Sequence, residues 1–230
     1  MIELSVILPV HNQADIIEPV YRQIRKTLNK LPISYECLLV ENGSADRSQE
    51  IVSRLAKTYT ATKALTAPLG YGSAVLTGLA KARGTYVCYM PSDGQIDLTV
   101  LPKLWNLAKS NRWDMVKVKR ITRETTPRLI FSRVLAYLTA LLFWIPPWDM
   151  NGSPRIVLRS KITQLNLTYK DSFIDIEFAV RAHALGWKIT EIPMITLPRY
   201  GGESTRSWRT FAEFLKNLWG FRISAGRRYF

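Results

Sequence analysis

The sequence predicts an α/β fold in which one mostly parallel sheet carries helices on both faces. Short apolar runs, typical of buried strands, alternate with stretches whose apolar residues recur at helical spacing. Such alternation favours parallel pairing, because each helix carries the chain back across the sheet to the next strand. Polar turns follow the ends of the apolar runs, and the length of 230 residues suits one sizeable domain.

The elements of the first half follow in order along the chain. The first apolar run, at residues 4–10, contains Pro9 near its end and predicts a strand. Apolar residues then recur at helical spacing from Ile16 to Leu28. The remaining predicted elements are a strand at 37–40, a helix around 51–55, a strand at 63–66, a helix at 73–82, a strand at 86–90 and a helix at 100–110.

The charge and the cysteines limit the possible partners and compartments. The formal net charge of +14 predicts a polyanionic partner, which could be nucleic acid, an anionic membrane surface or a phosphate-bearing substrate. Cys37 and Cys88 lie in apolar runs, which favours buried thiols over a disulfide. Buried free thiols are consistent with a reducing compartment. The first residues lack a basic segment and a long apolar run, so no secretory signal is predicted.

Polar clusters follow three of the predicted strands, at residues 9–12, 41–44 and 92–95. Each cluster alone is also what an ordinary turn requires. Together they indicate a ligand site, because open parallel sheets bind ligands outside the carboxyl ends of their strands. Gly70 and Gly72 precede a predicted helix whose N-terminus suits an anion, which points to a nucleotide. The first strand–helix turn has no G-x-G-x-x-G, so a dinucleotide fold is disfavoured.

Taken in order, four motifs resemble a known family. They are Ser-Val-Ile-Leu-Pro-Val-His-Asn at 5–12, Val-Glu-Asn-Gly-Ser-Ala-Asp-Arg at 40–47, Gly-Tyr-Gly-Ser-Ala-Val-Leu-Thr-Gly at 70–78 and Met-Pro-Ser-Asp-Gly-Gln at 90–95. This set is similar to the family 2 inverting glycosyltransferases of the GT-A fold, with a single Rossmann-like sheet. The branch it most resembles is the polyprenyl-phosphate sugar transferases of the dolichol-phosphate mannosyltransferase type.

The resemblance implies a domain plan and a donor site. It implies a catalytic domain at 1–205, with a nucleotide-sugar half at 1–112 and an acceptor half at 113–205, followed by a basic amphipathic helix at 206–230. A nucleoside diphosphate sugar would contact residues at the strand ends, and Mg²⁺ or Mn²⁺ would bind Asp93 and Gln95. The implied donor contacts are Pro9, His11, Asn12, Glu41, Asn42, Gly70, Gly72, Ser92, Asp93, Arg120, Arg199 and Arg206. Pro91 and Asn42 stand where the family has acids, so neither the metal affinity nor the nucleobase follows from the resemblance.

The resemblance also implies a polyprenyl phosphate acceptor and residues that would serve it. Arg128 and Ser132 have the spacing of the family's acceptor-phosphate contacts. Asp175 matches the family's acid, as a general base or as a group that orients the acceptor. A lipid phosphate is already an anionic nucleophile and needs little help from a base. A saccharide or protein acceptor is the alternative and requires Asp175 as a true base. A basic nucleic-acid-binding domain is a remote alternative, because the sequence has no recognised nucleic-acid-binding signature.

A basic stretch leads into an apolar one in the acceptor half. Residues 117–133 contain six basic groups and one acid, and residues 134–146 are almost entirely apolar. A helix of that length is too short to cross a bilayer. We expect the basic and apolar residues of 117–148 to contact an anionic membrane on its cytoplasmic face, with 128–148 as the interface segment and a core helix as the alternative. The apolar stripe at 211–219 is compatible with both a core and a membrane contact.

Overall fold

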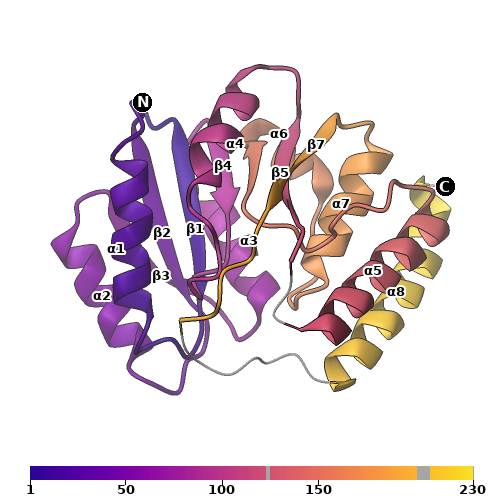
Figure 1. The fold of residues 1–230 in the computed structure, drawn as a ribbon, viewed down its shortest axis with the longest axis horizontal. Helices are drawn as coiled ribbons and strands as arrows, with labels where there is room; N and C mark the ends of the chain where they lie inside the picture. The colour runs from indigo at the N-terminus through magenta and orange to yellow at the C-terminus, as the bar shows by residue number, and fades with distance from the viewer. Residues whose placement is uncertain (123–124, 201–207, 230) are drawn as a thin grey trace.

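The computed structural model describes residues 1–122, 125–200 and 208–229, and these ranges contain a single mixed sheet of seven strands in the order β3-β2-β1-β4-β6-β5-β7. Helices pack on both faces of the sheet, as predicted (Figure 1). In chain order the elements are β1 (Leu4–Val10), α1 (Ile17–Leu28), β2 (Tyr35–Glu41), α2 (Ser48–Thr58), β3 (Thr62–Thr66), α3 (Tyr71–Lys81), β4 (Tyr86–Tyr89), α4 (Val100–Lys109), β5 (Met115–Arg120), α5 (Thr126–Phe143), β6 (Arg155–Leu158), α6 (Arg159–Ile162), a 3₁₀ turn (Thr163–Leu165), α7 (Ile174–Ala184), β7 (Ile189–Met194) and α8 (Trp208–Tyr229).

The first half of the sheet is parallel and matches the sequence prediction closely. β1 pairs in parallel with β2 and β4, and β2 pairs in parallel with β3. All seven residues of β1 are buried, because α1, α2 and α4 cover one face of the sheet and α3 and α7 cover the other. Parallel register brings the carboxyl ends of β1, β2 and β4 to one edge, which is where the predicted site belongs.

The second half of the sheet contains three strands that the apolar pattern did not predict. β6 pairs antiparallel with β4 and with β5, whereas β7 pairs in parallel with β5. β5 and β6 escape the apolar pattern because buried charged residues interrupt them: Lys117 lies in β5 and Arg155 in β6, and both are 0% exposed. The sheet is therefore mostly parallel with an antiparallel insertion at β6.

Helices α5 and α8 form a layer beyond the second half of the sheet, where they lie side by side (Figure 1). Leu135 and Phe143 of α5 join Phe214, Leu218 and Phe221 of α8 in a separate apolar cluster with α7. α5 begins at Thr126, well before the apolar run predicted to form it. Within the described ranges, none of the helices combines the length and hydropathy needed to cross a membrane.

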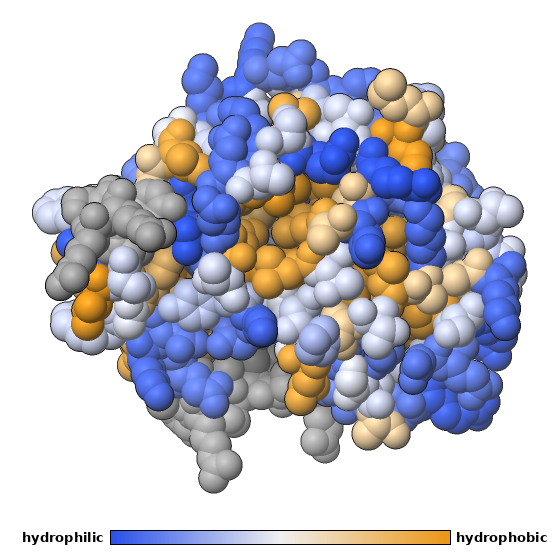
Figure 2. All heavy atoms as spheres, turned by 180° about the vertical axis from the view of Figure 1, so that it is seen from behind, coloured by the Kyte–Doolittle hydropathy of each residue, from blue (hydrophilic) through white to orange (hydrophobic). Residues whose placement is uncertain are grey.

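The face opposite to that of Figure 1 combines a polar rim with an apolar centre. Figure 2 shows hydrophilic side chains over much of its rim and hydrophobic ones gathered mainly in a recessed central area.

The two thiols provide a prediction about stability at high pH. Cys37 and Cys88 are buried and unpaired by a disulfide, as predicted, and burial raises the pKa of each thiol to about 12. A folded-state pKa above the unfolded value contributes stability that is complete below the unfolded pKa and is lost as pH rises through the folded one. We therefore expect the free energy of unfolding to fall as the pH rises from 9.0, the ordinary pKa of a cysteine thiol, to about 12. Replacing both cysteines by Ala should flatten this fall in denaturant titrations.

The same burial should protect the thiols from reagents at neutral pH. A disulfide reagent should modify neither cysteine in the native protein and both in denaturant, because the thiolate is the reactive form. Rapid native modification would contradict the buried position of the two side chains.

Candidate active site

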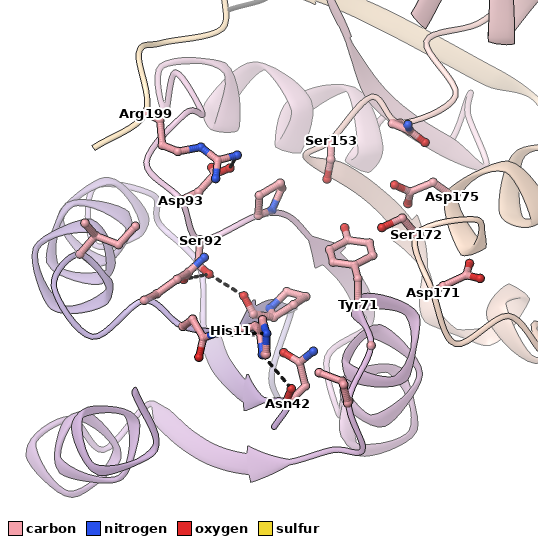
Figure 3. Close-up of a pocket in the computed structure, with 18 of the residues that line it drawn as sticks. His11, Asn42, Tyr71, Ser92, Asp93, Ser153, Asp171, Ser172, Asp175 and Arg199 are labelled. Carbon is pink, nitrogen blue, oxygen red and sulfur yellow. Dashed lines mark hydrogen bonds and ion pairs between the residues drawn. The ribbon is translucent and has the colours of Figure 1, made fainter. Parts of the chain in front are cut away.

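A pocket with a volume of about 340 Å³ opens at the carboxyl edge of the parallel strands. Residues from both halves of the chain line it, and Figure 3 shows them facing one another across the cavity. The lining includes ten of the predicted site residues, which are Pro9, His11, Asn12, Asn42, Gly70, Ser92, Asp93, Arg120, Asp175 and Arg199. It also includes residues that the sequence did not single out, among them Tyr71, Asn151, Ser153, Asp171 and Ser172.

The turns after β1 and β2 are joined by hydrogen bonds that hold them as one wall of the pocket. His11 Nδ1 lies 3.1 Å from the Asn42 carbonyl oxygen. The backbone N–H of Asn12 donates to Ser44 Oγ at 3.0 Å, and the N–H of Ala45 donates to Asn12 Oδ1 at 2.8 Å. Asn12 adopts a φ of 49°, a left-handed conformation that asparagine tolerates better than most residues. The wall is therefore rigid before any ligand binds.

Glu41 and Asn42 have different roles at the end of β2. Glu41 is buried and accepts a hydrogen bond from the Ser44 N–H at 2.5 Å, so it shapes the turn and is not part of the pocket lining. Asn42 lines the pocket, and its buried Oδ1 has no hydrogen-bond partner among the described residues. A buried acceptor without a donor is costly, which suits an atom that a ligand N–H would satisfy.

Asp93 follows β4 in a short turn that aims its carboxylate at the pocket. Asp93 Oδ1 accepts from the Gln95 backbone N–H at 3.2 Å, and Oδ2 lies 3.4 Å from Arg199 Nη2. Gly94 allows this turn with a φ of 79°, and a Cβ there would lie 2.5 Å from the Tyr200 ring. The side chain of Gln95, predicted as a metal ligand, lies 3.4 Å from Arg199 and is not among the lining residues.

The glycine pair before α3 serves a close approach of two backbones. A Cβ on Gly70 would lie 2.4 Å from the Lys170 carbonyl oxygen, and a Cβ on Gly72 would lie 2.4 Å from that of Tyr169. Gly70 lines the pocket with a φ of 126°, whereas Gly72 lies behind it. The pair thus lets residues 169–171 close this side of the pocket. A phosphate loop, as the sequence suggested, is not needed to explain it.

Asp175 lies across the pocket from His11, in the first turn of α7, and is held by two buried residues. Tyr89 OH donates to Asp175 Oδ1 at 3.1 Å, and Arg155 Nη2 lies 3.1 Å from the same oxygen. Burial disfavours the charged form of Arg155, but the Asp175 carboxylate holds the pKa of Arg155 above its ordinary value. Burial raises the pKa of Tyr89, so this hydroxyl keeps its proton. Neither partner is evident from the sequence, because Arg155 lies in an unpredicted strand and Tyr89 looks like an ordinary apolar strand residue.

Arg120 lines the pocket as one member of a buried charge network. Its guanidinium binds both carboxylate oxygens of Asp149, each at 2.8 Å. Beneath it, Lys117 Nζ lies 3.0 Å from Glu191 and donates to the Asp149 carbonyl oxygen at 2.6 Å. Burial lowers the pKa of Lys117 to about 8, against the attraction of Glu191. Lys117 therefore holds buried charges together, and Arg120 lines the pocket while paired with Asp149. Although both residues lie in the basic stretch at 117–133, they do not belong to an exposed basic face.

Three further predicted contacts, Arg128 and Ser132 for the acceptor and Arg206 for the donor, are not among the described residues that line the pocket. Ser132 is half-buried on α5 and does not line it. The backbone of Arg128 belongs to the same helix, but its side chain lies outside the described part of the structure, as does Arg206 entirely.

The residues present fit a divalent cation only if a ligand supplies most of its oxygens. Within the described ranges, no three His, Cys, Asp or Glu side chains come together as a metal cluster. Asp93 offers one carboxylate at the pocket wall, with its side chain 15% exposed. Mg²⁺ commonly binds through one or two carboxylates and completes its shell with phosphate oxygens and water. A cation shared with a diphosphate is therefore compatible with this donor set.

Comparisons with known proteins agree with the fold and the strand-end motifs. The sequence profile of "Glycosyl transferase family 2" matches residues 5–170. An uncharacterized glycosyltransferase of Mycobacterium bovis is 28% identical over 209 residues, which cover 87% of this chain and 88% of the relative. None of these matches shows the predicted closeness to dolichol-phosphate mannosyltransferases, which stays a prediction.

Solved structures share the architecture at low sequence identity. Glucosyl-3-phosphoglycerate synthase from Mycobacterium tuberculosis, in complex with Mn²⁺, UDP and phosphoglyceric acid, has a TM-score of 0.75 and 18% identity, covering 96% of this chain and 78% of that one. S. aureus TarS in complex with UDP-GlcNAc has a TM-score of 0.60 and 16% identity, covering 94% and 65%. These likenesses confirm the predicted fold. With the profile match over most of the chain, they lead to one conclusion: the protein belongs to glycosyl transferase family 2.

Proposed function

We propose that this chain transfers a sugar from a nucleoside diphosphate sugar to an anionic acceptor, with inversion at the anomeric carbon. The observation that carries the proposal is a pocket in which the strand-end residues His11, Asn42 and Asp93 lie across from Asp175. One wall thus offers groups for a nucleotide, and the other offers a carboxylate at the position of an incoming acceptor.

The donor would lie along the wall formed by the turns after β1, β2 and β4. Asn42 Oδ1 would accept an N–H from the nucleobase, which would satisfy its buried lone pairs. Arg199, 3.4 Å from Asp93, would donate to diphosphate oxygens. Glu41 would act indirectly, by holding the turn that presents Asn42.

A divalent cation, Mg²⁺ or Mn²⁺, would be held by Asp93 together with the donor's diphosphate. When bound, it would offset negative charge that develops on the departing nucleoside diphosphate. The glucosyl-3-phosphoglycerate synthase structures with Mn²⁺ or Mg²⁺ and UDP support this assignment by similarity of fold.

The reaction would be a direct displacement. An acceptor oxygen forms a bond to the anomeric carbon as the bond from that carbon to the diphosphate breaks, and the electron pair leaves with the nucleoside diphosphate. Attack from the face opposite the leaving group inverts the configuration. Asp175, fixed by Tyr89 and Arg155, would orient the acceptor, and with a hydroxyl acceptor it would also receive the proton.

Two acceptor classes fit this chemistry, and different observations favour them. Polyprenyl phosphate at the cytoplasmic face of a membrane is supported by the exposed apolar side chains of α5. A non-lipid acceptor, such as a saccharide, a protein or a small phosphate-bearing compound, is favoured by the comparisons, because the similar synthase was solved with phosphoglyceric acid. An anionic group on the acceptor suits the net charge of +14 in either case.

A transfer assay separates these acceptors. The protein would be incubated with a panel of nucleotide sugars and Mn²⁺, and with polyprenyl phosphate in detergent, phosphoglyceric acid or a neutral saccharide. We expect product only with a phosphate-bearing acceptor, and NMR of the product should show an anomeric configuration opposite to the donor's. Retention of configuration, or transfer to the neutral saccharide alone, would contradict the proposal.

A further inference from the structure

Helix α5 and its C-cap residue expose an apolar stripe along one side. Its members are spaced by four and three residues in turn, so they lie on one face of the helix. They point away from Leu135 and Phe143, which face the core. The exposed stripe consists of Ile130, Val134, Tyr137, Leu141 and Trp144, which are between 43% and 77% exposed.

Helix α8 is amphipathic in the same sense. Phe214, Leu218 and Phe221 are buried against α5 and α7, whereas Trp219 and Ile223 are 62% and 63% exposed. The sequence left open whether this helix docks on the core or lies on a membrane. One side of α8 docks on the core, and the other side is exposed. We call the exposed stripe of α5 together with Trp219 and Ile223 the outer face of α5 and α8.

The sequences of the two helices are strongly basic. The two helices contain seven basic residues and one acid, Glu213, in the sequence. Among the described side chains, Arg133 and Lys216 are exposed beside the apolar positions. Apolar and Trp side chains flanked by cations are the pattern by which amphipathic helices lie in the interface of an anionic bilayer.

The opposite side of α8 contacts the pocket wall. Asn217 of α8 donates to Asp171 Oδ2 at 3.0 Å, and Asp171 lines the pocket. The ring of Phe221 lies 5.8 Å from that of Tyr169, in the segment that closes the pocket beside Gly70 and Gly72. Helix α8 thus packs directly against the segment that closes the pocket, with its outer face on the far side.

We propose that the outer face of α5 and α8 docks on a membrane that contains anionic lipid. The exposed apolar side chains enter the interface and the surrounding cations bind lipid headgroups. This inference rests on the proposed function, because docking would bring the pocket to a lipid-linked acceptor. The basic residues Lys117 and Arg120, which the sequence suggested as part of the contact, are excluded from it by burial and by the pair with Asp149.

Vesicle sedimentation tests this surface without any donor or acceptor. Full-length protein would be mixed with phosphatidylcholine vesicles, with or without phosphatidylglycerol, at low and high salt. We expect clear binding only with phosphatidylglycerol, and partial release at high salt, because screening weakens the ionic part and leaves the apolar part. Tyr137→Ser with Leu141→Ser should weaken binding by about tenfold or more at both salt concentrations. Arg133→Gln should weaken it by about fivefold, at low salt only.

Matched controls keep the test decisive. Leu185→Ser removes a side chain that is 41% exposed outside the outer face and should leave vesicle binding unchanged. Trp219→Ser tests α8 independently if the α5 double variant folds poorly. Equal binding by wild type and outer-face variants would overturn the proposal. So would a wild-type dimer that ignores vesicles and becomes a monomer on Leu141→Ser, because a second copy of the chain would then cover this face. Nucleotide binding measured without lipid reports separately on the proposed function.

Discussion

Replacement of Asp93 by Asn is expected to reduce kcat/KM for sugar transfer by about 10³-fold at saturating metal. Asp93 is the one carboxylate that the turn after β4 places in the pocket lining. An amide is a poor ligand for a divalent cation and cannot balance the charge of Arg199, 3.4 Å away. The fold should survive, because an asparagine oxygen can still accept the Gln95 N–H. Initial rates across a metal titration and a denaturant unfolding curve would measure the two effects.

Asp97→Asn is the matched control for this variant. Asp97 lies in the same loop, outside the pocket lining, and accepts from the Thr99 N–H at 3.0 Å ahead of α4. Asparagine supports such an N-terminal turn about as well as aspartate. Near wild-type turnover by Asp97→Asn together with inactivity of Asp93→Asn supports the metal role. Full activity of Asp93→Asn at any metal concentration would contradict it.

Replacement of Arg155 by Met is expected to have the second largest effect. Arg155 is 0% exposed and its guanidinium pairs with Asp175, so the variant leaves a buried carboxylate without its cation. Breaking a buried pair in this way costs about 3–5 kcal/mol of unfolding free energy. Turnover should fall as well, because Asp175 would lose the partner that fixes its position in the pocket. Denaturant titration and steady-state kinetics would measure these effects separately.

A double variant distinguishes the structural effect from the catalytic one. Arg155→Met with Asp175→Leu replaces the whole pair by apolar groups, which is often neutral for stability. We expect it to recover most of the lost unfolding free energy and none of the lost turnover. If the double variant recovered turnover too, Asp175 would have no role in transfer. If Arg155→Met alone unfolded like wild type, the pair would contribute nothing to the fold.

The donor wall was predictable from sequence because its signals are local. β1 and β2 are apolar runs that end in polar turns, and parallel pairing brings those turns together wherever the rest of the chain lies. His11, Asn42 and Asp93 accordingly lie in one pocket. Glu41 and Gln95 belong to the same turns but face away from the cavity, and no sequence pattern distinguishes the two orientations.

The acceptor wall was less predictable because it depends on buried charges. Lys117, Arg120 and Arg155 look like surface residues in a sequence, yet they neutralise Glu191, Asp149 and Asp175 inside the protein. Such pairing joins residues up to 74 positions apart. The apolar run after residue 133 was ambiguous because α5 has one core-facing side and one exposed side, and both are apolar. The sequence alone therefore does not distinguish the buried residues from the exposed ones.

Calorimetric titration with nucleoside diphosphates tests the central claim, that the pocket binds the nucleotide of an activated sugar, most directly. The full chain would be titrated with diphosphates of each common nucleobase, with and without Mn²⁺, and compared with Asp93→Asn. We predict one-to-one binding of at least one nucleotide, about tenfold or more tighter with Mn²⁺, and loss of that metal dependence in Asp93→Asn. If no nucleotide bound under either condition, or if Asp93→Asn kept the full metal dependence, the account of this pocket as a nucleotide-sugar site would be contradicted.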